Sequence, residues 1–514
     1  MIYTDVSSKR RFIQCCCAIF WCLLSGGPIF GFAALKPILI KQGIYEEVCN
    51  VGIEVSDLVM ESQPTFTNML LGKVFALEND TVAKCTNQDL KLNMMFTVGA
   101  VVTNVSALVI GSVLDRYGPK VCGLIGAFFL YFACFIFIYA DNITDSFISS
   151  FFDPYLIGYA SMALGGPFAY ISSFQLSNSF PKKSGSVLAL LTGAFDSSSA
   201  LFLIFRIVYN KTQGSFSIED FFKVYLLVPV FITVAQIFVM EWDSYKTPPD
   251  TTLCVDDHQP TEEQPLLEPS HRRRDSIGDA LKQPYAEEGE ANLVKYSGGI
   301  FGILHGYSAK YQMKTPWFYL MCLFATIQML RLNYFVATIN TQYTYLLHSI
   351  SSAEALTKFF DLALPLGGVI SIPFVGLFLD YCSTVLVLNA LLAVSLLIGV
   401  LGCIGNYYTG IINVCIFVGY RPFFYTAVSD FCAKVFGFDT FGTVYGAIIC
   451  TSGIFNFSQS ILDKLTHTSF NMNPVPINII LVCLTVLIGG ITVTYVRIQA
   501  GLYNQRKQAQ LNSQ

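Results

Sequence analysis

The residues of this chain best suited to chemistry are charged side chains that stand within or between long apolar runs. Asp115 and Arg116 lie in the segment GSVLDRYGPK, Asp196 is followed by three serines, and Arg421 precedes an aromatic stretch. A charge in apolar surroundings is costly, so such groups face a water-filled cavity or an opposite charge. A carboxylate and a guanidinium in these places can bind polar solutes or hold helices together.

Groups for bond-making chemistry are missing from the sequence. It contains no G-x-x-x-x-G-K-(S/T) motif, which argues against an ATP-driven pump. Histidine and cysteine residues form no cluster with metal-ligand spacing, and the five histidines offer little for acid–base catalysis. We therefore expect no enzyme activity, no metal and no cofactor.

The composition is that of a membrane protein. Hydrophobic residues make up 53% of the 514 residues and charged residues 13%, against about 25% charged residues in ordinary soluble domains. So few charges cannot cover a soluble surface. The formal net charge of −4 argues against a broad basic face for nucleic acid. The lipid bilayer is the expected environment, and a small molecule is the expected ligand.

Apolar runs of about 20 residues, the length that crosses the hydrocarbon core, predict an all-α polytopic fold with twelve transmembrane helices in two six-helix halves. The runs cover residues 12–38, 92–113, 121–140, 152–174, 186–209, 221–240, 316–346, 359–379, 384–404, 408–429, 441–460 and 475–496. The chain then divides into an N-terminal half (1–240), a cytosolic central loop (241–315), a C-terminal half (316–496) and a cytosolic tail (497–514). The loop is polar, and we expect most of it to be disordered.

Lysine and arginine residues place both chain ends on the cytosolic side. They gather at the amino terminus, in the turns after the second and fourth helices, and in the tail. The opposite side then holds three glycosylation sequons, at Asn79, Asn142 and Asn210. Cys49 and Cys85 fall in a loop on that side, where they either form a disulfide or remain free thiols. The agreement between charges and sequons supports this orientation.

A glycine and an aspartate four residues apart recur at the cytosolic end of the second helix of each half. The first copy is Gly111 with Asp115, and the second is Gly376 with Asp380. Glycine lets helices approach closely, and the aspartate suits the amino-terminal dipole of a facing helix or an arginine. Because the second copy lacks the arginine and the later glycine, we expect the gate contact mainly at the first.

The first copy, together with Arg116, Gly118 and Lys120, resembles the G-x-x-x-D-R-x-G-x-K signature of the major facilitator superfamily. It departs from that signature at its third position, where leucine is preferred, and at its ninth, where a basic residue is usual. The resemblance implies a carrier whose halves rock about a central site. Substitution of Asp115 is then expected to slow the transport cycle, and substitution of Asp380 to matter less.

A narrower resemblance is carried by two segments. LTGAFDSSSALFLIFRIVYNKT (191–212) and RPFFYTAVSDFCAKVFGFDTFGTVYG (421–446) are similar to the fifth-helix region and the tenth-to-eleventh-helix region of the solute carrier 43 family. The similarity covers most of the transmembrane region and leaves out the central loop. It implies facilitated transport of nucleobases or large neutral amino acids, with nucleobases slightly favoured.

Six polar residues are candidates for the solute site: Asp196, Ser197, Tyr334, Asn340, Arg421 and Tyr425. The first two stand near mid-membrane in the fifth helix, where they either contact solute or form a structural polar knot. The next two stand on the seventh helix, which lines the cavity in this architecture. The last two share a helix face, and Asp430 or the cytosolic surface is the alternative partner of the arginine.

Two segments predict broken helices near the cavity. Ser25 to Pro28 interrupts the first helix, and Gly165 to Pro167 interrupts the fourth. A break frees backbone groups that a small polar ligand can bind. The same glycines serve equally well as close-packing points.

The central loop carries a candidate sorting motif. Glu262, Leu266 and Leu267 have the acidic-dileucine form that cytosolic sorting adaptors bind, so a lysosomal or vacuolar membrane and the plasma membrane are both open. An alternative function is a membrane sensor or scaffold that keeps the carrier fold and signals through this loop. Uptake of solutes distinguishes the two functions.

Overall fold

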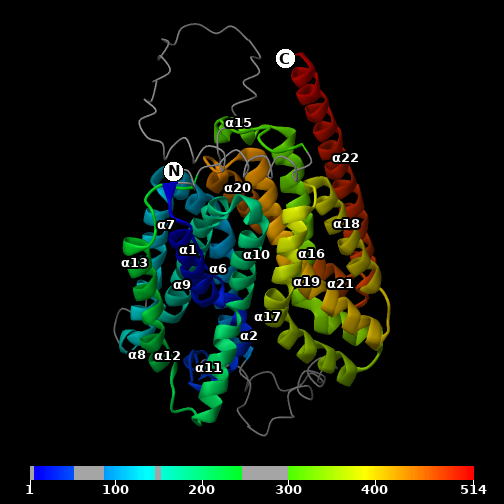
Figure 1. Cartoon of the computed structure of the whole chain (residues 1–514). Helices are drawn as coiled ribbons and strands as arrows, with labels where there is room; N and C mark the ends of the chain where they lie inside the picture. Colours follow the sequence, from blue (N-terminus) through cyan, green and yellow to red (C-terminus); the bar gives the residue numbers. More distant parts are fainter. Residues whose placement is uncertain (1–4, 51–85, 145–151, 246–298, 514) are drawn as a thin grey trace.

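The computed structural model describes residues 5–50, 86–144, 152–245 and 299–513, and these residues are helical almost throughout (Figure 1). The helices before the central loop are α1 (Ser8–Ser25), η2 (Pro28–Gly31), α2 (Phe32–Lys41), α3 (Glu47–Asn50), α6 (Thr86–Val105), α7 (Ala107–Ile138), α8 (Ala140–Thr144), α9 (Pro154–Ser173), η4 (Phe174–Ser179), η5 (Pro181–Lys183), α10 (Ser184–Ser197), α11 (Ala200–Lys211), α12 (Ile218–Tyr225) and α13 (Leu227–Phe238). Those after it are α15 (Ala309–Gln312), α16 (Pro316–Leu347), α17 (Ile350–Tyr381), α18 (Thr384–Leu401), α19 (Tyr407–Phe436), α20 (Phe441–Phe455), α21 (Ser458–Thr468) and α22 (Val475–Ser513).

The predicted membrane passes all fall on helices. Within the described ranges, nine helical segments are long and apolar enough to cross a membrane. One of them, Met94–Ile138, is 45 residues long and contains a non-helical residue at Gly118, so it supplies two passes. The two remaining predicted passes coincide with α9, which has 20 residues, and with the shorter apolar helix α20. The protein is therefore a polytopic all-α membrane protein, as the apolar runs predict.

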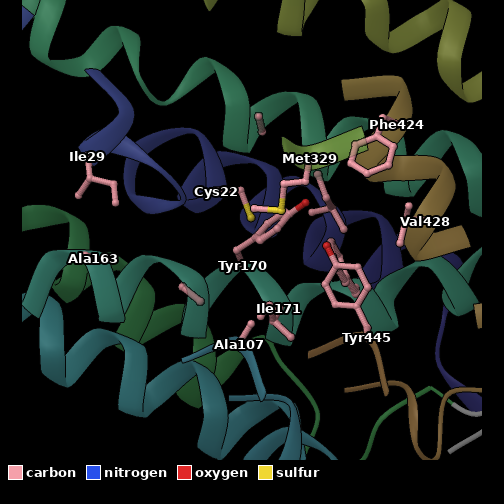
Figure 2. Close-up of a cluster of buried hydrophobic side chains, with 14 of the residues drawn as sticks. Cys22, Ile29, Ala107, Ala163, Tyr170, Ile171, Met329, Phe424, Val428 and Tyr445 are labelled. Carbon is pink, nitrogen blue, oxygen red and sulfur yellow. The ribbon is translucent and has the colours of Figure 1, made fainter. Parts of the chain in front are cut away.

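Large apolar side chains cover the outside of the helix bundle. Phe238 and Phe374 are more than 70% exposed, which would be unfavourable in water but suits contact with lipid. The inward faces form one continuous apolar cluster to which both halves contribute. Figure 2 shows part of it, with Tyr170 of α9 and Tyr445 of α20 among its members. The core therefore crosses the boundary between the halves.

The two most extensive helix contacts between the halves are α7 with α20 and α10 with α17, and α10 with α19 and α6 with α20 add to them. The backbones approach most closely at Gly111 of α7, where an added Cβ would lie 1.8 Å from the carbonyl oxygen of Gly442 in α20. Only glycine fits such a contact, which explains the small residue at the start of the repeated motif. The glycine therefore sets how near the halves can come.

The free ends of α1 and α22 lie at the same end of the molecule, together with α15 (Figure 1). We call this the terminal end, and the other end, which carries α3, α8 and the turn between α11 and α12, the opposite end. The shared position of the two chain ends fits an even number of passes. The segment 111–120 also lies at the terminal end, where α7 turns back on itself.

Both described flanks of the central loop are packed against the bundle. On the N-terminal flank, the Tyr245 hydroxyl donates to Gln14 at 2.6 Å and its backbone N–H donates to Gln175 at 2.8 Å. Burial raises the pKa of Tyr245 to about 12, so the hydroxyl remains a donor at neutral pH. The flanking backbone is thus held on the first half.

The C-terminal flank of the loop is held on the second half. The backbone N–H groups of Gly302 and Leu304 donate to carbonyls at the end of α19, at 3.0 and 3.1 Å, and Gln312 donates to the carbonyl of Phe436 at 2.9 Å. Residues 299–315 are therefore ordered, although they fall within the segment expected to be largely disordered. Residues 246–298 lie outside the described ranges.

Candidate functional site

The site is built at a break in the fifth predicted pass. The hydroxyl groups of Ser197 and Ser199 bond back to the carbonyls of Gly193 and Asp196, at 2.7 and 2.9 Å. Serine side chains that bond the backbone in this way compete with helical hydrogen bonding. Helix α10 accordingly ends at Ser197, and α11 begins three residues later at Ala200.

A second break lies beside the first. Helix α1 ends at Ser25, and the short turn η2 separates it from α2. The backbone N–H of Gly27 in this break donates to the Ser198 hydroxyl at 2.7 Å, so the two breaks are joined. The predicted interruption of the first helix is present, whereas α9 runs unbroken through Gly165 to Pro167. The predicted break in the fourth helix is therefore wrong.

Asp196, at the end of α10, faces Arg421 of α19 across the boundary between the halves. Their closest charged atoms, Oδ1 and Nη2, are 3.8 Å apart, and the side chains are 4% and 12% exposed. Neither oxygen of the Asp196 carboxylate has a hydrogen-bond partner among the residues that the structure describes. The two charges balance one another, yet the separation leaves both with capacity to bind a polar group.

Aromatic rings border this pair. The Arg421 guanidinium lies 5.7 Å from the centre of the Phe30 ring, which in turn lies 6.0 Å from Phe195. Tyr170 packs against Phe195 at 4.4 Å, and Tyr425, one turn beyond Arg421, interacts with its guanidinium. The charged pair is thus bordered by rings, and such a border suits the faces of a flat polar molecule whose edges meet the charges.

The other predicted solute ligands are not part of this charged pair or of the rings that border it. Ser197 is occupied by carbonyl groups, as described above. The hydroxyl of Tyr334 is hydrogen-bonded to Thr466 at 2.8 Å, and its ring packs in a small cluster with α22 inside the C-terminal half. Asn340 is exposed and accepts a hydrogen bond from Thr344, one turn along the same helix. Of the six candidates, the structure thus gathers Asp196, Arg421 and Tyr425 into one group at the boundary. Ser197 is at the boundary too, but its hydroxyl bonds the carbonyl of Gly193 and lies 3.5 Å from that of Pro365 in α17.

Asp430, the alternative partner proposed for Arg421, forms a different pair. Its Oδ2 lies 2.7 Å from the Lys434 Nζ on the same helix, and both side chains are buried. Positions four apart on a helix face one another, whereas positions nine apart lie on opposite faces. The expectation of an Asp430 contact to Arg421 is therefore wrong.

Asp115 caps a helix of the other half. Its Oδ1 accepts the backbone N–H of Gly442 at 2.8 Å, and its Oδ2 accepts that of Thr443 at 2.6 Å. Both donors are at the start of α20, where backbone N–H groups have no partner within the helix. The positive end of the α20 dipole adds to the attraction.

Asp380 makes the equivalent contacts between α17 and α10, the helix pair that corresponds to α7 and α20. Its carboxylate accepts the backbone N–H groups of Gly185 and Ser186 at the start of α10, at 2.7 and 3.2 Å, and the Ser186 hydroxyl. The expectation of a weak second contact is thus not met. A cap requires a carboxylate and a helix N-terminus, and neither the arginine nor the later glycine takes part in it.

The remaining motif residues shape the turn. Gly118 has φ of +84°, a conformation that costs other residues about 1–2 kcal/mol. The Lys120 Nζ donates to the carbonyl of Ile237 near the end of α13, at 3.0 Å, and lies over the Trp242 ring. Arg116 is exposed and lies beside the ring of Tyr117. Within the described residues, Arg116 therefore contributes less to the contact than Asp115 does.

Some of the candidate glycosylation, disulfide and sorting residues lie within the described ranges. Asn142 in α8 and Asn210 in α11 are exposed at the opposite end. Cys49 is disulfide-bonded, and its pairing with Cys85 stays a prediction. Asn79, Cys85, Glu262, Leu266 and Leu267 lie outside the described residues.

Solved structures share this fold. The proton:xylose symporter XylE matches with a TM-score of 0.60 and 11% identity, over 96% of this chain and 97% of that one. The human organic anion transporter MFSD10 matches with a TM-score of 0.58 and 11% identity, over 95% and 100%. XylE is described as a member of the major facilitator superfamily, and MFSD10 shares its fold. The chain therefore has the fold of the major facilitator transporters.

Proteins of similar sequence show to which family this chain belongs. No family model matches the sequence. Protein FMP42 of Saccharomyces cerevisiae is 48% identical over 95% of both chains, and this chain belongs to the same family. The equilibrative nucleobase transporter 1 of Bos taurus is 24% identical over 91% of this chain and 92% of its own. The human large neutral amino acids transporter small subunit 3 is 24% identical over 39% of this chain and 32% of its own.

Proposed function

We propose that the transported solute is a nucleobase, bound between Asp196 and Arg421. The observation that carries the proposal is this loosely spaced, buried ion pair with rings of both halves around it. A nucleobase is flat and neutral, with N–H donors and ring-nitrogen or carbonyl acceptors on its edge. A carboxylate accepts from such donors, a guanidinium donates to such acceptors, and the ring faces stack on aromatic side chains.

The relatives support the same solute class. The bovine nucleobase transporter aligns with nearly the whole chain, whereas the human amino-acid transporter aligns with about two fifths of it. The first alignment therefore includes α10 and α19 together with the remainder of both halves.

A large neutral amino acid is the second candidate. One specific observation favours it, the presence of opposite charges side by side at the boundary. A zwitterion would place its carboxylate on Arg421 and its ammonium group on Asp196. Each charge of the protein would then exchange one partner for another, which keeps the buried charges balanced.

Uptake into proteoliposomes tests these candidates. Adenine, hypoxanthine, leucine and phenylalanine are offered to wild type, Asp196→Asn and Arg421→Gln. For a nucleobase carrier, both variants retain some hydrogen-bonding capacity, and we expect adenine or hypoxanthine uptake with KM raised about tenfold. For an amino-acid carrier, Arg421→Gln removes the charge that a carboxylate needs, and leucine uptake is lost.

The matched control is Lys223→Gln, which removes an exposed charge paired with Glu219 at 2.7 Å in α12. It should leave uptake unchanged. If wild type moves none of the four solutes, the proposed solute class is wrong, and deletion within the central loop then tests the sensor or scaffold alternative through a change in signalling.

The proposed mechanism is alternating access driven by the solute gradient. In this mechanism, the Asp115 and Asp380 caps stabilise the state closed at the terminal end, and their opening lets the halves rock about Asp196 and Arg421. Transport is then facilitative, and net uptake should persist when a protonophore collapses the pH gradient. A protonophore that abolishes uptake would contradict facilitated diffusion.

We also propose that the terminal end faces the cytosol. Lys120, Lys182, Lys183 and Arg497 support this orientation through the excess of positive charge in cytosolic segments. The chain would then present residues 262–267 to sorting adaptors in a lysosomal or vacuolar membrane. Replacement of both leucines of the motif by alanine should move a tagged protein to the plasma membrane, and an unchanged location would contradict the sorting role.

A further inference from the structure

A second buried arginine lies inside the C-terminal half. Arg331 of α16 points between α18 and α22, where its Nη1 donates to the Thr485 hydroxyl at 3.0 Å and its Nη2 to the carbonyl of Ser395 at 2.9 Å. A further hydrogen bond joins Nη1 to the Ser395 hydroxyl. These bonds use three of the five N–H groups of the guanidinium. All three acceptors are electrically neutral.

Arg331 has no carboxylate partner within 4 Å among residues 5–50, 86–144, 152–245 and 299–513. A guanidinium does not lose its proton in a protein, and an unbalanced charge buried within a membrane span costs at least several kcal/mol. Arg331 therefore differs from Arg421, which faces Asp196.

A cavity of about 40 Å³ adjoins Arg331. Gln328, Tyr420 and Asn478 also line it, and the first two have unsatisfied polar atoms. The Nε2 of Gln328 and the hydroxyl of Tyr420 make no hydrogen bond of good geometry with any described residue, although these side chains are only 1% and 3% exposed. Two hydrogen-bond donors that need an acceptor thus adjoin one small space beside the Arg331 guanidinium.

We propose that this cavity binds one small monovalent anion, for which chloride is the probe. The arginine supplies the opposite charge, while the Gln328 amide and the Tyr420 hydroxyl supply hydrogen bonds. The volume holds one or two water-sized particles, which excludes an amino acid, a nucleobase or any larger organic anion. Water alone would satisfy the donors but would leave the charge of Arg331 unbalanced.

The anion site is separate from the proposed solute site. Arg421 and Asp196 do not line the cavity, whose lining residues belong to α16, α18, α19 and α22 and include Gly402. Tyr420 and Arg421 are consecutive on α19 and therefore point in different directions. An anion here would stabilise the C-terminal half itself, and its binding does not require that the protein carry a nucleobase.

The test is thermal unfolding of the purified full-length protein in detergent, at constant ionic strength, with sodium gluconate replaced stepwise by sodium chloride. For wild type, we expect a saturable rise of the unfolding midpoint with chloride. Tyr420→Phe should raise the half-saturating chloride concentration about tenfold, the effect of one hydrogen bond to a charged group. Arg331→Gln should abolish the chloride effect.

Tyr343→Phe is the matched control, because Tyr343 is a buried tyrosine of the same half whose hydroxyl contacts Asn413 and lies outside the cavity lining. It should keep the wild-type chloride response. If Arg331→Gln does not fold, the half-saturating chloride concentration of Tyr420→Phe, compared with that of Tyr343→Phe, decides the outcome. Equal unfolding midpoints in chloride and gluconate for wild type, or an unchanged half-saturation in Tyr420→Phe, would overturn the proposal.

Discussion

Asp380 in α17 accepts the backbone N–H of Gly185 at 2.7 Å, at the start of a helix that belongs to the other half of the chain. Asp115 in α7 does the same for Gly442 in α20, at 2.8 Å. Each half therefore supplies one carboxylate to a helix of the other, at the same end of the molecule. The two contacts are equivalent in kind, although the motifs around them differ.

Equal caps predict equal effects of substitution. Asp115→Asn and Asp380→Asn each remove the charge from a cap, a loss of about 1 kcal/mol, and each should increase opening at the terminal end about fivefold. Alkylation of a cysteine introduced beneath the caps measures that opening, and the order of solute preference should not change.

Asp220→Asn is the control for this pair, because Asp220 caps α12 within its own half by accepting the N–H of Ser217. It should leave the alkylation rate unchanged. A response of Asp380→Asn much smaller than that of Asp115→Asn would show that the arginine and later glycine of the first motif matter after all.

The pair of Asp196 and Arg421 predicts a non-additive effect on stability. Asp196→Asn or Arg421→Gln alone leaves one buried charge unbalanced, a loss of about 3 kcal/mol or more. The double variant removes both charges, so its unfolding free energy should fall by less than the sum of the two single losses. Thermal unfolding without solute measures all three, and additive losses would show that the 3.8 Å separation carries no coupling.

Gly118→Ala should destabilise the turn within α7. The positive φ disfavours any side chain by about 1–2 kcal/mol, and an added Cβ would lie 2.7 Å from the carbonyl oxygen of Trp242. The unfolding midpoint should therefore fall. Gly490→Ala, at a position in α22 where an added Cβ meets nothing within 4 Å, should keep or raise the midpoint, since alanine favours a helix.

Asn210 tests which side of the membrane the opposite end occupies. It is exposed at the end of α11, within an Asn-Lys-Thr sequon, so a lumenal or extracellular position permits glycosylation. Glycosidase treatment should increase the gel mobility of wild type by a step that Asn210→Gln lacks. Absence of that step in protein from a glycosylating host would argue against the proposed orientation.

The sequence predicted the helices well because lipid leaves the backbone few choices. An apolar run that crosses a bilayer must satisfy its own N–H and C=O groups, so its length alone indicates a helix. The Gly-Gly-Pro segment after Ser25 marked one helix break correctly, whereas the break at the serines after Asp196 was missed, because the apolar run 186–209 was read as one continuous helix. Gly165 to Pro167 did not break α9, because neighbouring helices can support a helix through such residues.

Contacts between helices were harder to predict. The pairing of Asp196 with Arg421 depends on how α10 and α19 lie against one another, which no local pattern encodes. Tyr334 was favoured because of its helix, yet polar residues occur on more than one side of α16, so the sequence does not say which face meets the boundary. The equivalence of Asp380 and Asp115 was missed because an arginine in the motif was taken as part of the contact.

The two flanks of the central loop are fixed to different halves, Tyr245 to the first and Leu304 to the second. In a carrier whose halves rock, the distance between Tyr245 and Leu304 changes in every transport cycle. That distance therefore differs between the two conformations of the carrier. A protein that binds the loop and fixes the distance between its two ends would favour one conformation over the other. A sorting partner would then also slow or accelerate transport.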